Sequence, residues 1–450
     1  MTTDHTSAAL SSPAQEVLFI DSRVPDLQAI MAAARPGVKV VILDPSESGV
    51  AQMAKALEGL HGLASISVVS HGDEGVLLLG NGPLFSGNLE QYQAQLKAIG
   101  AALGADGDLL LYGCDVGAGE AGTQFLQALA QLTGADVAAS NDSTAGAVRG
   151  GDWDLEVTSG QIEATAALHV QALEGYDFSL HTASVSTVAA LKAAIATGST
   201  DGLDDVITFT GNITFASAAD AVAINVTDGQ KMSIVGGGFT LSGGNLARVL
   251  DVTAGAVSID NLTITNGFLA GNGGNAPGSN QGGDALGAGI KNAGTLTITN
   301  SSITANKAAG GGGGGGATAA FYVGGGGGGG GFGPGVGGDG GTSIATGGPA
   351  TYQATAGVAG IGGHGGGGGP ATYAGKGGST TGGAGGNTGG FYTPGSAGAT
   401  ANNGSISIGG GGGGVGYDAT GGRGGNAAAA IYNTGTLIVT GSTITNNIAA

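Results

Sequence analysis

The segment Ala288–Ala308, AGIKNAGTLTITNSSITANKA, decides the fold of the second half of the chain, because it returns almost unchanged at Ala429–Ala449 as AAIYNTGTLIVTGSTITNNIA. In both copies apolar residues alternate with Thr and Ser, and Asn and Gly flank the alternating runs. A shorter copy precedes them at Gly255–Asn266. Alternation of this kind predicts strands with one buried face. Its repetition predicts coils that stack on one another.

These repeats are typical of a right-handed parallel β-helix, in which Ile, Leu and Val stack inward and Asn and Gly adopt tight corner conformations. We therefore expect an all-β right-handed parallel β-helix over residues 186–308 and a further coil over residues 429–450. The helix-like stretch Val185–Ala196 is expected to cap the coils. Because the sequence stops inside a repeat, we expect more coils beyond it.

A glycine-rich insertion, residues 309–428, separates the last two coils, and a smaller insert lies at Ala270–Gly287. Glycine accounts for 99 of the 450 residues, with no G-X-Y period that would indicate collagen. Runs such as Gly310–Gly316 cannot bury enough apolar surface to form a core. Two alternatives remain open: flexible arms, or packed helices of the polyproline II type. Scattered Phe and Tyr in the larger insertion favour partial order.

Residues 17–178 predict an α/β domain, because short apolar runs alternate with helix-like stretches. These runs are apolar on both faces, which favours a parallel-rich sheet flanked by helices. The expected strands are Val17–Asp21, Val38–Leu43, Ile66–Ser70, Leu109–Tyr112 and Ala135–Ala139, with an added hairpin strand at Val76–Leu79. The expected helices are Asp26–Ala34, Ser48–Leu60, Leu89–Leu103 and Glu120–Leu132. Residues 1–16 are expected to be disordered, and residues 179–185 to form a linker.

The charge distribution restricts the partners of the protein. The formal net charge is −19, which argues against binding to nucleic acid or to anionic membranes. Residues 1–180 hold 22 of the 32 acidic residues, so the remainder is nearly uncharged. A surface of Gly, Ala, Ser, Thr and Asn suits an extracellular scaffold. The expected partners are cell-surface or extracellular matrix components, carbohydrate among them, and secretion machinery.

Localisation cannot be read from the usual signals. No run reaches the roughly 20 apolar residues of a membrane span. The first 16 residues lack the basic and apolar regions of a classical signal peptide. The one cysteine, Cys114, excludes an intramolecular disulfide. We expect secretion or display on the outer cell surface through a signal elsewhere.

Two motifs in the α/β domain carry potential chemistry: Val68-Val69-Ser70-His71-Gly72 and the run LLLYGCD at Leu109–Asp115. In each, an apolar strand ends in a reactive side chain. The carboxyl ends of neighbouring parallel strands face one crevice, where catalytic groups gather. A histidine and a cysteine placed there can form a base and nucleophile pair.

This arrangement resembles the caspase-like cysteine peptidases of clan CD, which include legumain, gingipain and the self-cleaving RTX-toxin groups. The 43 residues that separate His71 from Cys114 are similar to the roughly 50 of caspases. The resemblance implies that His71 is the base and Cys114 the nucleophile. It also implies that the backbone N–H groups of Gly72 and Cys114 polarise the scissile carbonyl.

As a whole, the domain resembles an uncharacterised domain at the N-terminus of very large secreted adhesins of Gram-negative bacteria. The shared features are FIDSRVPD at Phe19–Asp26, SHG at Ser70–Gly72, LLLYGCDVG at Leu109–Gly117, TGADVAAS at Thr133–Ser140 and GGDWDLE at Gly150–Glu156. The resemblance implies a pectate-lyase-like β-helix behind a caspase-like domain that serves export, processing or retention. It implies no agreed activity for the domain itself.

Two hypotheses follow. In the first, the protein is a structural adhesin and Cys114 is an inert core residue. In the second, residues 17–178 are an active cysteine endopeptidase that cuts its own chain or a surface partner. Trp153 is expected to pack in the core, and the isolated Asp251, Asp260, Lys291 and Lys307 favour a stalk over a polysaccharide lyase. No metal or cofactor is expected, because one Cys and scattered His do not make a zinc set and the glycine tracts lack a P-loop lysine.

Overall fold

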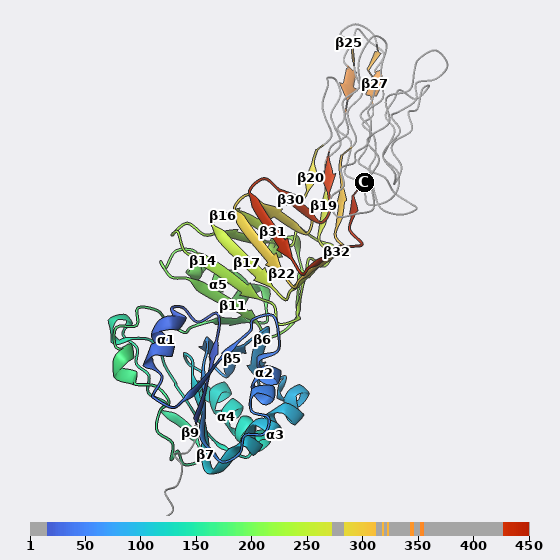
Figure 1. The fold of residues 1–450 in the computed structure, drawn as a ribbon. Coiled ribbons are helices and arrows are strands. Elements are labelled where there is room, and N and C mark those ends of the chain that lie inside the picture. The colour runs from blue at the N-terminus through green and yellow to red at the C-terminus, as the bar shows by residue number, and fades with distance from the viewer. Residues whose placement is uncertain are drawn as a thin grey trace, which may run out of the picture. The chain divides into compact units, whose positions relative to one another are not determined.

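The computed structural model describes residues 16–271, 283–311 and 426–449, together with four short strands between residues 317 and 354. The expected disordered N-terminus, nearly all of the insertion 309–428 and much of the insert 270–287 lie outside the described residues. The chain divides into two compact units (Figure 1). Unit 1 comprises Met1–Val185 and Asp205–Thr210, and unit 2 comprises Ser186–Asp204 and Gly211–Ala450.

Unit 1 is built on a six-stranded sheet of order β2-β1-β3-β7-β8-β9. The strands are β1 Glu16–Asp21, β2 Lys39–Leu43, β3 Leu63–Val69, β7 Leu103–Tyr112, β8 Asp136–Ala139 and β9 Val157–Ser159. All pairs are parallel except β8 with β9. The five strands expected from the sequence are present, so the prediction of a parallel-rich α/β domain is confirmed. The antiparallel edge strand β9 was not expected.

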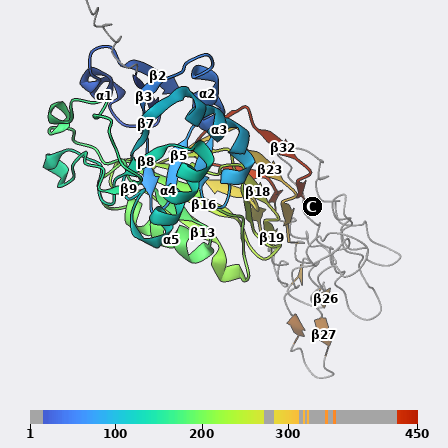
Figure 2. The same ribbon diagram turned by 90° about the horizontal axis from the view of Figure 1, so that it is seen from below.

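Helices cover both faces of this sheet because its strands are apolar on both sides. The helices are α1 Leu27–Ala33, α2 Gly49–Ala56, α3 Gln93–Ala102 and α4 Gly119–Thr133. Phe19 of β1 joins the core cluster that contains α2, α3 and α4, whereas its neighbours Leu18 and Ile20 join the cluster that contains α1. Figure 2 shows α1 on the opposite side of the strands from α2 and α3.

Two further features of unit 1 lie at the carboxyl edge of the sheet. The expected hairpin is present as β5 Val76–Leu79 and β6 Gly82–Phe85, preceded by β4 Gly72–Asp73. The expected linker 179–185 is instead part of the folded unit. Leu180 and Thr182 are fully buried, and β10 Ala183–Val185 pairs in parallel with β11 Asp205–Phe209. The apolar side chains Leu180 and Val185 find partners in the unit, so this stretch does not behave as a solvated linker.

Unit 2 begins with helix α5 Val188–Gly198, close to the expected capping helix, and continues as short parallel strands in several sheets. One sheet contains β14 Lys231–Val235, β17 Ala256–Asp260, β22 Thr295–Thr299 and β31 Thr436–Thr440. A second contains β12 Ile213–Thr214, β15 Thr240–Ser242, β18 Thr263–Thr265, β23 Ser302–Thr304 and β32 Thr443–Thr445. A third contains β13 Val222–Asn225, β16 Leu250–Ala254, β21 Ile290–Asn292 and β30 Ile431–Asn433.

Among the described residues, these parallel sheets are not detected as a closed helix. Two smaller parallel sheets accompany them. They join β19 Phe268–Ala270, β24 Lys307–Ala309 and β33 Ile448–Ala449, and also β20 Ala285–Leu286 and β29 Ala427–Ala428. In the insertion, β25 Ala317–Thr318 pairs antiparallel with β26 Tyr322–Val323, and β27 Ser343–Ala345 with β28 Tyr352–Ala354.

The pairing register of the coils repeats the sequence match. Thr295 lies opposite Thr436 and Ile303 lies opposite Ile444, an offset of 141 residues that equals the offset of the two sequence copies. Leu296, Ile298 and Ile303 are completely buried. The register is kept although residues 312–425 intervene, because the inward residues of adjacent coils select one another.

Buried asparagines fix the corners of the coils. Asn306 is fully buried, donates from Nδ2 to Asn447 Oδ1 at 2.9 Å and accepts from the Gly267 N–H at 2.8 Å. Other asparagines, among them Asn261 and Asn300, adopt the left-handed conformation with φ near 50°. These asparagines thus adopt the left-handed conformation that was expected of them.

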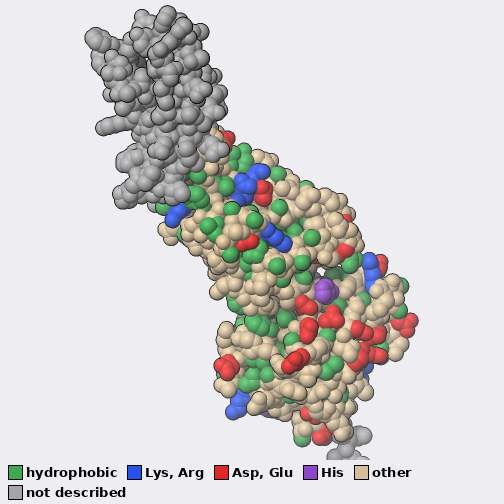
Figure 3. All heavy atoms as spheres, turned by 180° about the vertical axis from the view of Figure 1, so that it is seen from behind, with side chains coloured by type: hydrophobic (Ala, Val, Ile, Leu, Met, Phe, Trp, Pro, Cys, Tyr) green, Lys and Arg blue, Asp and Glu red, His purple; other side chains and the backbone are tan. Residues whose placement is uncertain are grey.

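Figure 3 shows acidic side chains gathered on unit 1, whereas the visible part of unit 2 exposes mostly uncharged surface. This agrees with the unequal distribution of acids along the sequence. Among the described residues, no helix combines the length and the apolar character that crossing a bilayer requires.

Candidate active site

The two motif residues follow neighbouring strands, as the sequence predicts. β3 and β7 pair in parallel, with Val69 opposite Tyr112, and His71 and Cys114 each stand two residues beyond that pair. Both side chains therefore belong to the carboxyl edge of the sheet, where α/β folds place their sites.

The imidazole of His71 is engaged by backbone carbonyls on both sides. Its Nδ1 lies 3.0 Å from the carbonyl oxygen of His181, and its Nε2 lies 3.3 Å from that of Arg23. A carbonyl oxygen only accepts, so the neutral imidazole can donate to just one of these two oxygens, and the lone pair of its other nitrogen faces the second carbonyl. The side chain is buried, and this burial lowers the pKa of His71. Among the described residues, no hydrogen bond links His71 to Cys114.

The thiol of Cys114 is also buried, with only 1% of the residue exposed. Its Sγ lies 3.3 Å from Ser179 Oγ, 3.6 Å from the Thr144 carbonyl oxygen and 4.0 Å from Ser143 Oγ. Burial is the largest cause that raises the pKa of the Cys114 thiol, and the nearby Asp115 carboxylate raises it further. A nucleophilic cysteine needs the opposite, a cationic and accessible surrounding that stabilises the thiolate.

Aromatic packing accounts for the surroundings of Cys114. The ring centroids of Tyr112 and Trp153 are 6.1 Å apart, and those of Trp153 and Tyr176 are 5.7 Å apart in an edge-on arrangement. All of these residues belong to one buried cluster with Cys114. Trp153 is 5% exposed, which agrees with its expected role in packing.

A segment of unit 1 that we call the strap, residues 176–182, crosses the carboxyl edge of the sheet. The Leu180 N–H donates to the Thr144 carbonyl at 3.2 Å, and the Thr182 N–H donates to the Gly72 carbonyl at 2.9 Å. The Gly72 N–H donates to the Leu180 carbonyl at 2.8 Å. The expected oxyanion donor, the Gly72 N–H, is thus already engaged by the strap.

The glycine of the His-Gly motif has a packing role of its own. A Cβ atom on Gly72 would lie 2.5 Å from Val116 Cγ2 and 2.7 Å from the Cys114 carbonyl oxygen. A Cβ on Gly113 would lie 2.9 Å from the Ser70 carbonyl oxygen. Both glycines therefore permit the close approach of the two strand ends, whether or not the edge is catalytic.

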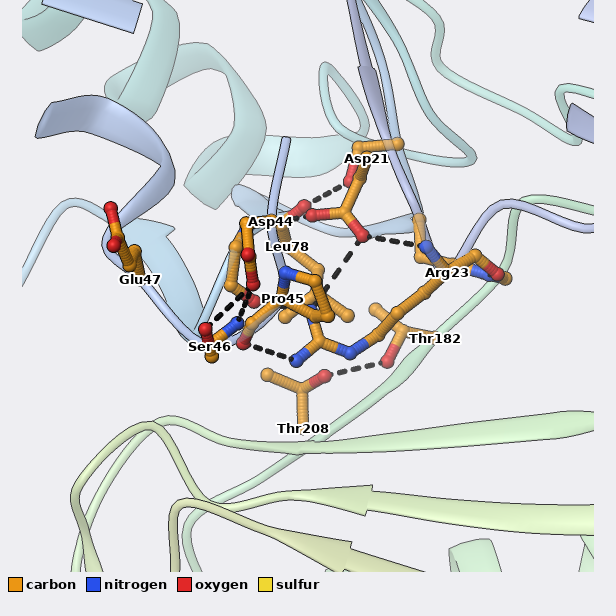
Figure 4. A network of polar contacts seen from close by, with 12 residues as sticks. Asp21, Arg23, Asp44, Pro45, Ser46, Glu47, Leu78, Thr182 and Thr208 are labelled. Carbon is orange, nitrogen blue, oxygen red and sulfur yellow. Dashed lines mark hydrogen bonds and ion pairs between the residues drawn. The ribbon is translucent and has the colours of Figure 1, made fainter. Parts of the chain in front are cut away.

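Sequence reasoning missed a charged pair at the same edge (Figure 4). Asp21, fully buried at the end of β1, accepts from the backbone N–H groups of Arg23 at 3.0 Å and Gly80 at 2.6 Å. The Arg23 guanidinium lies 3.6 Å from Asp21 and donates to the carbonyls of Gly80 and Pro45. Burial raises the pKa of Asp21, and the charge of Arg23 opposes that rise. The sequence did contain a signal for Asp21, because this carboxylate ends the apolar run of β1 and β1 pairs in parallel with β3.

These contacts link the ends of neighbouring strands at the carboxyl edge of the sheet. The Arg23 carbonyl faces His71 and the Arg23 side chain ties β1 to the hairpin and to the turn after β2. The end of β3 is thereby held between the end of β1 and the strap. As it stands, the arrangement can position backbone segments, but it offers neither an activated thiolate nor an open oxyanion donor at Gly72.

Residues 17–180 match the family described as Domain of unknown function (DUF4347). This segment is similar to that family. No curated protein and no solved structure matches the chain. The family description assigns no activity.

Proposed function

We propose that the chain is the N-terminal portion of a large secreted or cell-surface adhesin-like bacterial protein. In this proposal unit 2 is a right-handed parallel β-helix that serves as a stalk. Unit 1 is a caspase-like module for export, processing or retention that has lost peptidase activity. The observation that supports the stalk is the in-register stacking of the coils, from Thr295 on Thr436 to Ile303 on Ile444.

The outward positions of the coils support a scaffold over an enzyme. The residues between the inward apolar ones in β17, β22 and β23 are mainly Ser and Thr. Asp251 and Lys291, expected to be isolated, form ion pairs in a cluster with Arg248, whose Nη1 lies 2.7 Å from Asp251. One carboxylate shared by two cations is neutralised, which does not favour the multi-acid site of a polysaccharide lyase.

Binding of the full chain to surfaces tests the adhesive part. We expect the purified protein to bind to immobilised glycans or extracellular matrix proteins. Because unit 2 carries few charges, the protein should stay bound during a wash with about 0.5 M salt. If a variant that lacks residues 255–309 is retained as well as the full chain, the deleted coils are not responsible for binding. Complete absence of binding across glycans, matrix and bacterial cells would contradict adhesion and reduce unit 2 to a spacer.

The second candidate function, a cysteine endopeptidase, is supported by one observation: His71 and Cys114 do follow neighbouring parallel strands. Its strongest form is cleavage of the chain itself. We expect the wild-type protein and Cys114→Ala to show the same intact mass after prolonged incubation at neutral pH. Cleavage of the wild type that is absent from Cys114→Ala would establish the peptidase and contradict the proposal for unit 1.

A further inference from the structure

Three carboxylates of unit 1 meet at the amino edge of the sheet, opposite the candidate active site. Asp108 and Asp136 lie side by side in the register of the parallel strands β7 and β8. Glu163 approaches from the segment after β9, and oxygen atoms of all three side chains lie within 4.8 Å of one another. No Lys or Arg forms an ion pair with any of them in the part of the chain that the structure describes.

One oxygen of this cluster is buried and has no partner. Asp108 is 99% buried, with a relative exposure of 1%. Its Oδ2 accepts from the N–H groups of Glu163 at 2.9 Å and Ala164 at 2.7 Å. Its Oδ1 has no hydrogen-bond partner. A buried carboxylate oxygen without a partner is unfavourable, and such a group calls for an explanation by an ion or by water.

Space for a ligand exists beside two of these three residues. Asp108 and Asp136 line a polar cavity of about 80 Å³, together with Asp106 and the glycines around them. That volume admits an ion with a few coordinating waters. The backbone also approaches Asp136 closely: the Gln161 N–H donates to its Oδ2 at 3.1 Å, and a Cβ on Gly160 would collide with the carboxylate at 1.9 Å.

We propose that Asp108, Asp136 and Glu163 bind a calcium ion. Calcium takes oxygen ligands at about 2.3–2.6 Å, so two of its ligands lie no more than about 5.2 Å apart, and the three carboxylate oxygens, all within 4.8 Å of one another, satisfy that limit. Magnesium binds at about 2.0–2.1 Å and demands a tighter octahedron. An ion between the three carboxylates relieves their mutual repulsion and supplies the partner that Asp108 Oδ1 lacks.

Such an ion would join three segments that are distant in the sequence. Asp108 stands in β7, Asp136 begins β8, and Glu163 belongs to the segment that leads to the strap. Calcium binding is therefore expected to stabilise unit 1 rather than to take part in a reaction.

A second acidic cluster offers a matched control. Asp142, Asp152 and Glu156 also bring their carboxylate oxygens within 4.8 Å of one another, but all three are exposed. None of them contains a buried oxygen without a partner. The buried Asp108 Oδ1 without a partner therefore distinguishes the first cluster from the second.

The test is isothermal titration of the chelator-treated, full-length protein with CaCl₂ and with MgCl₂, together with thermal unfolding in CaCl₂ and in EDTA. We expect binding of one calcium ion with a higher melting temperature, and at least tenfold weaker binding of magnesium. Asp136→Asn and Glu163→Gln should weaken calcium binding at least tenfold, whereas Glu156→Gln should leave it unchanged. Glu163 is exposed, so its variant is expected to fold even if Asp136→Asn does not.

Two results would overturn the proposal. The first is the absence of both binding heat and calcium-dependent melting, which would mean that the three carboxylates hold no calcium ion. The second is binding that survives Glu163→Gln and is lost in Glu156→Gln, which would assign calcium to the exposed cluster.

Discussion

The chemical state of Cys114 gives the sharpest test of the reasoning about unit 1. The thiol is 1% exposed and lies beneath the strap, so a reagent reaches it only when the strap opens. Opening of residues 179–182 of the strap breaks three backbone hydrogen bonds, two with Gly72 and one with Thr144. It also exposes Leu180, which is fully buried.

The slowing of alkylation can be worked out from these contacts. Three hydrogen bonds contribute about 0.5–1.5 kcal/mol each, and exposing a buried leucine costs about 1.5–3 kcal/mol. The opening free energy is therefore about 3–7 kcal/mol, and labelling that requires it is slowed by about 10²–10⁵-fold relative to the unfolded chain. The raised pKa of the Cys114 thiol slows it further, because the thiolate is the reacting form.

The assay is intact mass spectrometry after treatment with iodoacetamide or a peptidyl electrophile, and Cys114 is the only cysteine that can react. Protein in denaturant gives the reference rate. Leu180→Ala should speed labelling by about tenfold or more, because truncating a buried leucine destabilises its surroundings by about 2–5 kcal/mol. His71→Ala should not slow labelling. Rapid labelling of the native wild type that falls in His71→Ala would refute the reasoning and establish an activated nucleophile.

Other predictions concern the coils and the dependence of stability on pH. Asn306→Ala should destabilise unit 2 by about 2–4 kcal/mol in urea unfolding, because it leaves the buried Gly267 N–H without its partner and removes one of the two hydrogen bonds that Asn447 Oδ1 accepts. A change below about 0.5 kcal/mol would show that the asparagine side chain contributes nothing. Burial lowers the pKa of His71 below its ordinary value of 6.5, so the unfolded chain binds the extra proton first and stability is lost as pH falls below 6.5. For one proton, the free energy of unfolding cannot change by more than about 1.4 kcal/mol per pH unit. His71→Gln should remove this dependence from unfolding curves measured between pH 5 and 7. An equal dependence in both proteins would assign the titration to another group.

The sequence predicts those parts of the fold that depend on local patterns. The alternating repeat fixes both the strands and the register of Thr295 on Thr436, because a slip by one residue would turn every inward side chain outward. The strands of unit 1 are likewise visible as apolar runs, and placing His71 and Cys114 at one edge required only that the strands be parallel neighbours.

The parts that sequence reasoning missed depend on contacts between distant segments. Residues 179–185 look like a polar linker, and the burial of Leu180 becomes evident only when Gly72 and Thr144 lie on either side of it. The same holds for Asp108, which lies in β7 just before its apolar run Leu109–Tyr112 and meets Glu163 only 55 residues later. A pattern of spacing located the candidate dyad, but it contained no information about accessibility, and accessibility decides whether a thiol reacts.

The strap and Glu163 of the carboxylate cluster belong to one continuous stretch, residues 160–182, and this stretch connects the two edges of the sheet. Glu163 and Ala164 hold Asp108 at the amino edge, and Leu180 and Thr182 hold Gly72 at the carboxyl edge. If residues 160–182 open as one cooperative segment, calcium bound at Glu163 must slow the labelling of Cys114, because a ligand that binds only the closed form lowers the population of the open one. At a calcium concentration 100 times the dissociation constant the expected slowing is about 100-fold. An unchanged labelling rate at saturating calcium, with binding itself confirmed by titration, would show that the strap opens alone and that the two edges are mechanically independent.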